Sequence, residues 1–313
     1  MNGTRRAFIG TVAGGAVALA ASKVAGRTEP QFYVAALTML DRTGKFDDAL
    51  NKDYLTFLAK GGADGVLGLG TTGEFPSFSI RERKQVLESI MKHKGKLSVI
   101  AHVGTSNVPE TIELLEHATH LGVEKALVIP PYYFKNPSVE ALALFYEPIL
   151  KAAKIPVMLY NIPQMSGAAI TPELLRRLSS FERLHGIKDS FSKADVMTSF
   201  IKEFPKLKVI TGVPGNIETN LKEGGAGTIT GNGSVFVRET AAIFAAHRSG
   251  GDVHAAQMKF NETAKSMGGY DSIPGSKFVM SLMGMRESPT RPPLLDLTDE
   301  KKREAVEKFK RKG

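Results

Sequence analysis

Short apolar runs alternate with longer amphipathic segments along the chain from residue 32 onward, and this alternation repeats eight times. Several of the runs are almost continuously apolar, which is typical of strands buried on both faces of a parallel sheet. Segments between them, such as Ile80–Lys92 and Thr111–His120, place apolar residues at helical spacing. The eight predicted strands are Phe32–Leu40, Asp64–Gly70, Leu97–Val103, Lys125–Pro130, Pro156–Ile162, Leu184–Ser190, Lys208–Pro214 and Gly227–Gly233.

Eight strand and helix pairs over about 220 residues match a (β/α)8 TIM barrel in number and size. A doubly wound sheet would show fewer such units or a clear second domain. Ser138 and Thr171 mark two helix starts, because capping residues are favoured there and Thr171 is followed by proline. We therefore expect an α/β fold with a barrel catalytic domain over residues 27–250. Residues 251–313 are expected to form a C-terminal helical extension of three helices.

The composition narrows the chemistry that the chain can perform. The 313 residues include no cysteine and no tryptophan, so disulfides, thiolate nucleophiles, cysteine zinc sites and iron–sulfur clusters are excluded. Any nucleophile must be Lys, Ser, Thr, Tyr, His or a carboxylate. Lys and Arg number 41 against 32 Asp and Glu, a net charge of +9. This excess by itself suggests an anionic partner, either a nucleic acid or a small acidic substrate.

Residues 1–26 have the pattern of an export signal. Arg5, Arg6 and Lys23 flank a charge-free run from Ala7 to Ala21, which is too short and too small-sided to span a bilayer as a stable helix. The residues around Arg5 and Arg6 resemble the twin-arginine export pattern. We therefore expect an exported or periplasmic protein whose mature chain carries +6. The alternatives are an N-terminal extension of a cytoplasmic protein and an uncleaved anchor.

Three further patterns have simpler interpretations than binding sites. Residues 68–73 satisfy the glycine spacing of a dinucleotide site, but residues 74–76 precede the next predicted helix and no acidic residue ends the next strand. His117 and His120 have a spacing that permits metal binding, yet with no carboxylate at a nearby strand end a solvated helix face is favoured. The basic segment Lys301–Lys312 interleaves acidic and apolar residues, which indicates a packed amphipathic helix and no nucleic-acid site.

Polar residues at the ends of the predicted strands are the candidate site, because barrels of this kind bind ligands there. Lys188 is unusual among them, since it lies within a run that otherwise predicts a strand. Burial in or around the barrel penalises the charged ammonium, and a neutral lysine amine commonly forms a Schiff base with a carbonyl carbon. The alternatives are a buried ion pair with Asp189 and a lysine that reaches the rim.

Two neighbours favour the nucleophile. Tyr160 ends the preceding predicted strand and could move protons at the carbinolamine oxygen. The loop from Gly70 to Gly73 offers small residues, backbone amides and the hydroxyls of Thr71 and Thr72, which suit a carboxylate. The alternatives are that Tyr160 serves only for packing and that the loop from Gly70 to Gly73 is a turn without a ligand. Together these residues supply an amine, an acid/base and an anion cradle, as a 2-oxo acid requires.

These segments resemble the dihydrodipicolinate synthase / N-acetylneuraminate lyase family of class I, pyruvate-dependent aldolases. The resemblance extends from Gln31 to Phe309. Its motifs are Gly70-Thr71-Thr72-Gly73-Glu74, Pro130-Pro131-Tyr132-Tyr133, Tyr160-Asn161-Ile162-Pro163, Gly186-Ile187-Lys188-Asp189 and Arg291-Pro292-Pro293-Leu294.

The resemblance implies catalytic roles. Lys188 would form the imine with pyruvate or another 2-oxo acid, and an aldehyde would be the second substrate or product. Tyr160 would shuttle protons, and Thr71 with Tyr133 would complete a proton relay. In the family this last tyrosine often reaches in from an adjacent subunit, so a homo-oligomer is expected, as a tetramer or a dimer. No metal, other cofactor or nucleic acid is implied.

The resemblance also implies the substrate-binding positions. Thr72 and the neighbouring amides, including that of Gly73, would hold the carboxylate, while Gly212 and Ile229 match positions whose backbone lines the pocket. Ser190 matches a position that tends to carry a hydroxyl in the sugar-acid branches.

Met165 stands where dihydrodipicolinate synthases carry a carboxylate-binding arginine, and a thioether cannot make that bidentate contact. Residues 163–167 look more like the sialic-acid lyase and 2-keto-3-deoxy-sugar-acid branches, although residues 212–215 lack the acidic pair of sialic-acid lyases. A lyase acting on a 2-keto-3-deoxy sugar acid is therefore the preferred hypothesis. 4-Hydroxy-tetrahydrodipicolinate synthase activity and a non-catalytic exported 2-oxo-acid binding protein are the alternatives.

Overall fold

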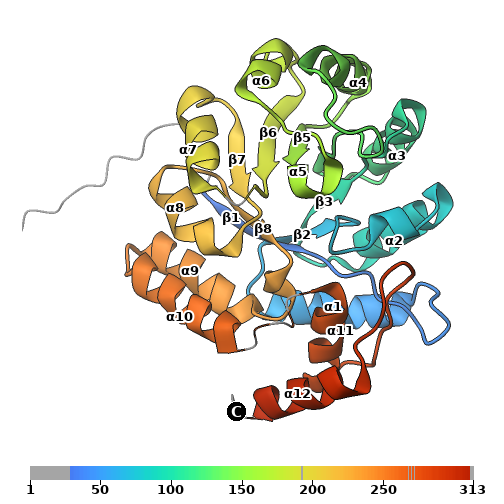
Figure 1. Cartoon of the computed structure of the whole chain (residues 1–313), viewed down its shortest axis with the longest axis vertical. Coiled ribbons are helices and arrows are strands. Elements are labelled where there is room, and N and C mark those ends of the chain that lie inside the picture. The colour runs from blue at the N-terminus through green and yellow to red at the C-terminus, as the bar shows by residue number, and fades with distance from the viewer. Residues whose placement is uncertain (1–28, 192, 267, 269, 271, 311–313) are drawn as a thin grey trace, which may run out of the picture.

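A computed structural model describes residues 29–310 except 192, 267, 269 and 271. Eight parallel strands close into a barrel in the order of the chain, and β1 pairs with β8. The predicted TIM barrel is therefore confirmed (Figure 1). The strands are β1 Gln31–Ala35, β2 Gly65–Gly68, β3 Ser98–His102, β4 Lys125–Val128, β5 Val157–Asn161, β6 Leu184–Asp189, β7 Lys208–Thr211 and β8 Gly227–Thr230.

Helices surround the barrel and follow its strands. Ser138 and Thr171 cap α4 and α6 through their side chains, as the sequence predicted. The helices of the barrel are α1 Asp48–Lys60, α2 Ile80–His93, α3 Val108–His120, α4 Val139–Ala152, α5 Pro163–Ser166, α6 Pro172–Leu178, α7 Ala194–Glu203, α8 Ile217–Lys222 and α9 Val237–Ser249. Three short 3-10 turns are η1 Phe75–Ser77, η2 Pro214–Asn216 and η3 Asn232–Ser234.

The strands are shorter than the apolar runs that predicted them. The first run extends to Leu40, but β1 ends at Ala35, and residues 36–40 continue as buried chain outside the sheet. The amide of Leu40 donates to the Ser288 hydroxyl at 2.8 Å. The apolar character of this segment therefore reflects burial outside the sheet as well as strand formation.

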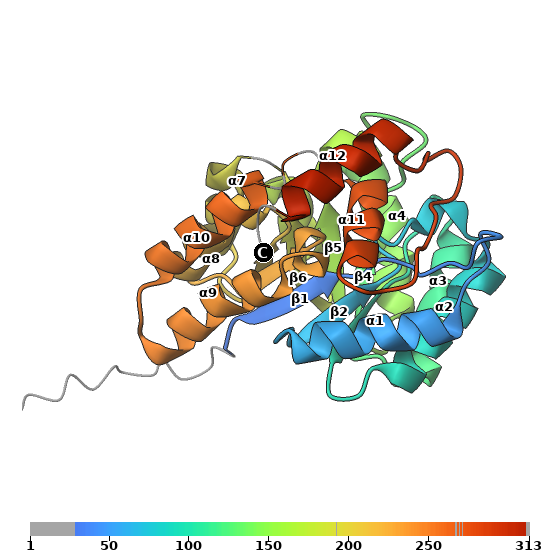
Figure 2. The same cartoon turned by 90° about the horizontal axis from the view of Figure 1, so that it is seen from below.

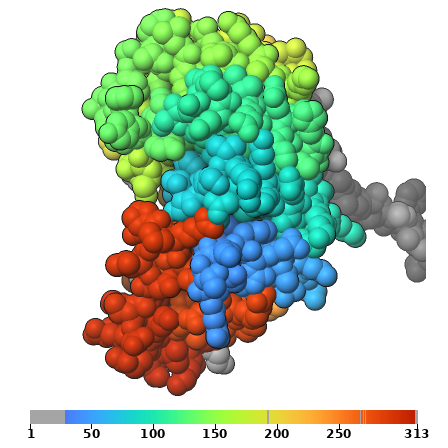
Figure 3. All heavy atoms as spheres, turned by 90° about the vertical axis from the view of Figure 1, so that its right-hand side faces the viewer, coloured from blue at the N-terminus to red at the C-terminus, as the bar shows by residue number. Residues whose placement is uncertain are grey.

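The C-terminal extension consists of α10 Val253–Ser266, α11 Ile273–Leu282 and α12 Asp299–Lys310. Helices α11 and α12 lie on the same side of the barrel as α1 (Figure 2). In the space-filling view, the red C-terminal segment lies against the blue segment that contains α1 (Figure 3). Ala305 of α12 is fully buried, which fits the amphipathic helix predicted for the basic tail. Helix α10 packs against α9 and α8, whereas α11 and α12 lie on the side of α1 (Figure 1).

Residues 1–28 lie outside the described residues, and the predicted export signal lies among them. Within the described part of the chain, no helix combines the length and the apolar character needed to cross a membrane.

Candidate active site

Lys188 and Tyr160 lie side by side on adjacent strands. They are paired in the register of β6 and β5, and paired residues point to the same face of a sheet. The Lys188 amine lies 4.3 Å from the centroid of the Tyr160 ring. Both residues are buried, with 4% and 2% of their surface exposed. The lysine is therefore held against an aromatic phenol and away from bulk water.

Thr71 joins this pair from the opposite side of the barrel mouth. Its hydroxyl lies 3.4 Å from the Tyr160 hydroxyl, and it follows β2, which is not a neighbour of β5 in the barrel. The contact crosses the mouth, so Tyr160 and its partner Lys188 face the barrel interior. The sequence predicted that these three residues would meet at the strand ends, and the structure brings them together.

The loop that carries Thr72 and Gly73 packs tightly against β1 and β8. A Cβ atom added to Gly231, just after β8, would lie 2.7 Å from the Thr72 hydroxyl oxygen. A Cβ atom on Gly73 would lie 3.0 Å from the Ala36 carbonyl oxygen, and the Gly73 carbonyl accepts a 2.7 Å hydrogen bond from Thr38. The loop therefore packs closely against the chain that follows β1 and β8, with the Thr72 hydroxyl beside Gly231.

Ser190 and Gly212 approach Lys188 from the ends of β6 and β7. A Cβ atom on Gly212 would lie 1.9 Å from the Ser190 hydroxyl oxygen and 3.0 Å from Lys188 Cε, so only glycine fits beside the two side chains. The Gln164 amide donates to the Ser190 carbonyl at 2.9 Å. Ile229 is fully buried in β8. Gly212 and Ser190 thus lie beside the lysine, and their contacts with substrate stay predictions.

Tyr133 and Met165 stand apart from this cluster in the single chain. They are 77% and 59% exposed, and the Tyr133 ring contacts the edge of Phe134. Among the described residues, no hydrogen bond links Tyr133 to Thr71 or Tyr160. The relay role of Tyr133 and the substrate contact of Met165 stay predictions.

Asp189 does not pair with the lysine beside it. Successive strand residues point to opposite faces, and the Asp189 carboxylate accepts a 2.6 Å hydrogen bond from the Asn161 amide on the outer side of the strands. No ion pair joins Lys188 and Asp189 within the described chain, so that alternative is wrong. Burial raises the pKa of Asp189 to about 6, against the opposing hydrogen bonds from Asn161 and the Phe191 amide.

Asp189→Asn should flatten the pH dependence of folding stability. The folded carboxyl titrates near 6 and the unfolded one near 3.8, so the folded state binds more protons in between and loses stability as the pH rises. The loss is about 2 kcal/mol between pH 4 and 7. Denaturant unfolding at several pH values should show this contribution in wild type and in the control Asp195→Asn, but not in Asp189→Asn. An unchanged slope in Asp189→Asn would contradict the assignment.

His102 and Arg83 are part of the site's surroundings that the sequence analysis missed. The His102 ring lies 6.2 Å from the Tyr160 ring, and Arg83 of α2 donates to the His102 carbonyl at 2.8 Å. Burial, with the nearby cations Arg83 and Lys188, lowers the pKa of His102 well below its usual value. The imidazole next to the Tyr160 ring is therefore neutral. The only sequence signal was a histidine at the end of an apolar strand.

The other sequence patterns take structural roles. Helix α2 begins at Ile80 behind a Ser79 capping box, so no helix opens at the third glycine of residues 68–73. His117 of α3 lies 3.3 Å from the Glu88 carboxylate of α2. Over the residues that the structure describes, no group of three His, Asp or Glu side chains could hold a metal ion.

Comparisons with known proteins agree with this architecture. Residues 30–312 match the model of the dihydrodipicolinate synthetase family. The chain is 37% identical to an uncharacterized DapA-like lyase of Chloroflexus aurantiacus, covering 87% of this chain and 93% of that protein. It is 34% identical to 4-hydroxy-tetrahydrodipicolinate synthase of Acidothermus cellulolyticus, covering 87% and 90%. The crystal structure of YagE from E. coli K12, a family member in complex with pyruvate, matches with 27% identity and a TM-score of 0.81, covering 90% and 98%.

A buried amine over a phenol at the mouth of a parallel barrel is an arrangement that suits class I aldolases and lyases. The chain belongs to the dihydrodipicolinate synthetase family. It is therefore an enzyme, a lyase of this family, whose members use pyruvate and aldehydes.

Proposed function

We propose that the protein reversibly cleaves a pyruvate-derived aldol compound through an imine on Lys188. The observation that carries this proposal is the Lys188 amine, 4.3 Å from the Tyr160 ring centroid, with the Tyr160 hydroxyl 3.4 Å from Thr71. This arrangement supplies a buried nucleophile and a proton carrier at one point of the barrel mouth. Family membership supports the same chemistry.

The reaction needs only protons and water besides the substrate. The lysine nitrogen attacks C2 of the 2-oxo acid, and the carbonyl oxygen leaves as water to give an iminium. The C4 hydroxyl then loses its proton, the C3–C4 bond breaks, and the electron pair moves toward the iminium nitrogen as the aldehyde departs. C3 takes up a proton, and water releases pyruvate and the free amine. Tyr160 and Thr71 accept and return these protons.

The carboxylate of the 2-oxo acid is assigned to the loop after β2. The amides of Glu74 and Phe75 already donate to the carbonyls of Thr71 and Gly70. The Thr72 hydroxyl and the amides of Thr72 and Gly73 are therefore the groups assigned to the anion. The surface excess of positive charge has no part in this contact.

A 2-keto-3-deoxy sugar acid is the proposed substrate. Met165 lies on the short helix α5 after β5 and is 59% exposed, and its thioether cannot form a bidentate contact with a second carboxylate. The competing candidate is 4-hydroxy-tetrahydrodipicolinate synthase activity, which the name of the Acidothermus relative favours.

A substrate panel separates the two candidates. The enzyme is incubated with a series of 2-keto-3-deoxy sugar acids and pyruvate release is measured, in parallel with pyruvate and aspartate semialdehyde. We expect kcat/KM to be highest for a sugar acid. A higher value with aspartate semialdehyde would overturn the substrate assignment, and pyruvate binding without any turnover would favour a binding protein.

We also propose that a second copy of the chain completes the site through Tyr133. This tyrosine and Phe134 form an exposed aromatic pair on the loop after β4, as a side chain that enters a neighbouring subunit would require. Mixing Lys188→Arg with Tyr133→Phe under subunit exchange should give more activity than the two variants separately, because Tyr133 of one subunit then serves the lysine of another. Additive activity would place Tyr133 outside the relay.

Export through residues 1–26 is proposed from the sequence alone. Because the twin-arginine pathway depends on both arginines, Arg5→Lys/Arg6→Lys should retain the protein in the cytoplasm. Cell fractionation followed by immunoblotting measures this, and Lys23→Arg is the control that keeps the arginine pair. Unchanged export of the double variant would refute the twin-arginine assignment.

A further inference from the structure

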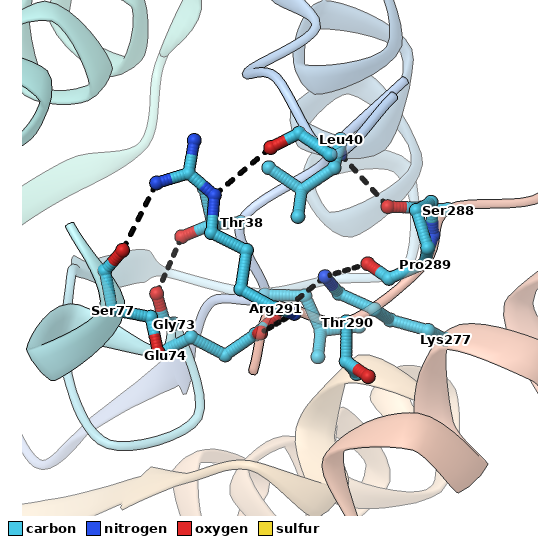
Figure 4. A network of polar contacts seen from close by, with 12 residues as sticks. Thr38, Leu40, Gly73, Glu74, Ser77, Lys277, Ser288, Pro289, Thr290 and Arg291 are labelled. Atoms are coloured by element: carbon cyan, nitrogen blue, oxygen red, sulfur yellow. Dashed lines mark hydrogen bonds and ion pairs between the residues drawn. The ribbon is translucent and has the colours of Figure 1, made fainter. Parts of the chain in front are cut away.

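A buried ion pair connects the C-terminal extension to the substrate loop. The Lys277 amine of α11 lies 2.6 Å from one carboxylate oxygen of Glu74. Their side chains are 1% and 0% exposed. Glu74 directly follows Gly73 and is the residue before η1, so the pair lies at the end of the loop that carries Thr71 and Thr72. Figure 4 shows Gly73, Glu74 and Lys277 close together.

Both partners make further bonds to the extension. The second carboxylate oxygen of Glu74 accepts a 2.8 Å hydrogen bond from the Arg291 amide. The Lys277 amine also donates to the Pro289 carbonyl at 2.6 Å. The loop carboxylate is therefore held from two points of the extension, the helix α11 and the segment around Arg291 (Figure 4).

The loop between Leu69 and Glu74 has a backbone that needs such support. Leu69 and Glu74 both adopt left-handed conformations, with φ of 58° and 57°. This region is unfavourable for residues with a Cβ atom and persists where surrounding contacts enforce it. Thr71 and Thr72 lie between these two residues, so the contacts that hold Glu74 also constrain the backbone that carries the two threonines.

Burying the charges of Lys277 and Glu74 costs desolvation free energy, and a purely structural role does not explain why this cost is borne. Burial lowers the pKa of Lys277, while Glu74 opposes this shift. A well-packed apolar pair of similar volume is often as stable as a buried ion pair. An ion pair does, however, fix the direction and distance between two segments more sharply than apolar contacts do.

We infer that Lys277 and Glu74 are positioning residues, which set the Thr71–Thr72 loop for substrate carboxylate binding from the C-terminal extension. This inference rests on the proposed function, because it assigns the loop to the carboxylate. It gives α11 a part in the reaction although the helix contributes no group to the substrate.

The test traps the Lys188 imine with borohydride at increasing pyruvate concentrations and measures the trapped fraction by intact mass. The quantity compared between variants is the pyruvate concentration that gives half-saturation. The variants are Lys277→Met, Glu74→Gln and the double variant. The control is Arg286→Met, which removes another ion pair between extension and barrel, Arg286 with Asp47 at 2.9 Å, where Arg286 is 60% exposed. We expect half-saturation to rise about tenfold or more in all three test variants, because small displacements of binding groups have effects of this size. The control should stay within about twofold.

The double variant separates positioning from stability. Single variants leave an uncompensated buried group, whereas the double variant removes both charges and should recover folding stability. We expect its half-saturating pyruvate concentration to stay raised. Recovery of both properties together would make the pair merely structural, as would failure of all three variants to fold, and would overturn the inference.

Unchanged half-saturation in folded Lys277→Met or Glu74→Gln would also overturn it. If wild type itself gives no Lys188 adduct with pyruvate, the proposed function fails instead. The two failures are thus distinguishable in one experiment.

Discussion

Lys188→Arg should lower kcat by about 10⁴-fold or more, because arginine keeps the positive charge but cannot act as an amine nucleophile. The structure gives the lysine a specific place for this role. Its amine is buried at the interior of the barrel mouth over the Tyr160 ring, and Gly212 leaves room for its side chain. Steady-state pyruvate release from the best substrate of the panel measures the loss.

The matched control for this prediction is Lys193→Arg. Lys193 is an exposed lysine just before α7, and its replacement should leave kcat within about twofold. Circular dichroism confirms that both variants fold. Retention of more than a tenth of the wild-type kcat in folded Lys188→Arg would contradict imine catalysis by this residue.

Tyr160→Phe should lower kcat by about 10²- to 10⁴-fold, the usual contribution of one positioned acid/base group. Phenylalanine keeps the ring beneath the Lys188 amine and removes only the hydroxyl that lies 3.4 Å from Thr71. The imine should still form, so mass spectrometry after borohydride treatment should detect the adduct while turnover is lost.

Tyr146→Phe is the control for the loss of a buried phenol. The Tyr146 hydroxyl is buried in α4 without a hydrogen-bond partner in the described chain, so its removal should leave kcat unchanged. Equal effects of the two variants would mean that Tyr160 contributes packing and not proton transfer.

The periodic pattern predicted the fold because each strand and helix carries its own local signal. Eight apolar runs gave eight strands in chain order, and Ser138 and Thr171 cap helices as expected. The strand ends were less accurate. Residues 36–40 are buried outside the sheet, where Leu37 hydrogen-bonds to Tyr54 of α1 and Leu40 hydrogen-bonds to Ser288. No local pattern distinguishes such burial from burial in a sheet.

Some residues of the candidate site were likewise predictable from the sequence, and others were not. Lys188 was predictable because a lysine interrupts an apolar strand, and Tyr160 because it ends the preceding strand. The contact of Lys277 with Glu74 was not predictable from the sequence, because it joins residues far apart in the chain. Lys277 also lies on a helix without other residues of the candidate site. Long-range pairs leave no periodic trace in one sequence.

The central claim is that Lys188 forms a covalent imine with a 2-oxo acid, and borohydride trapping tests it most directly. The enzyme is incubated with pyruvate, reduced, digested and analysed by peptide mass spectrometry. The reduced pyruvyl adduct is expected on the peptide that contains Lys188, and Lys188→Arg should show none. An adduct on a different lysine, or no adduct with pyruvate and the wider panel of 2-oxo acids, would contradict the claim.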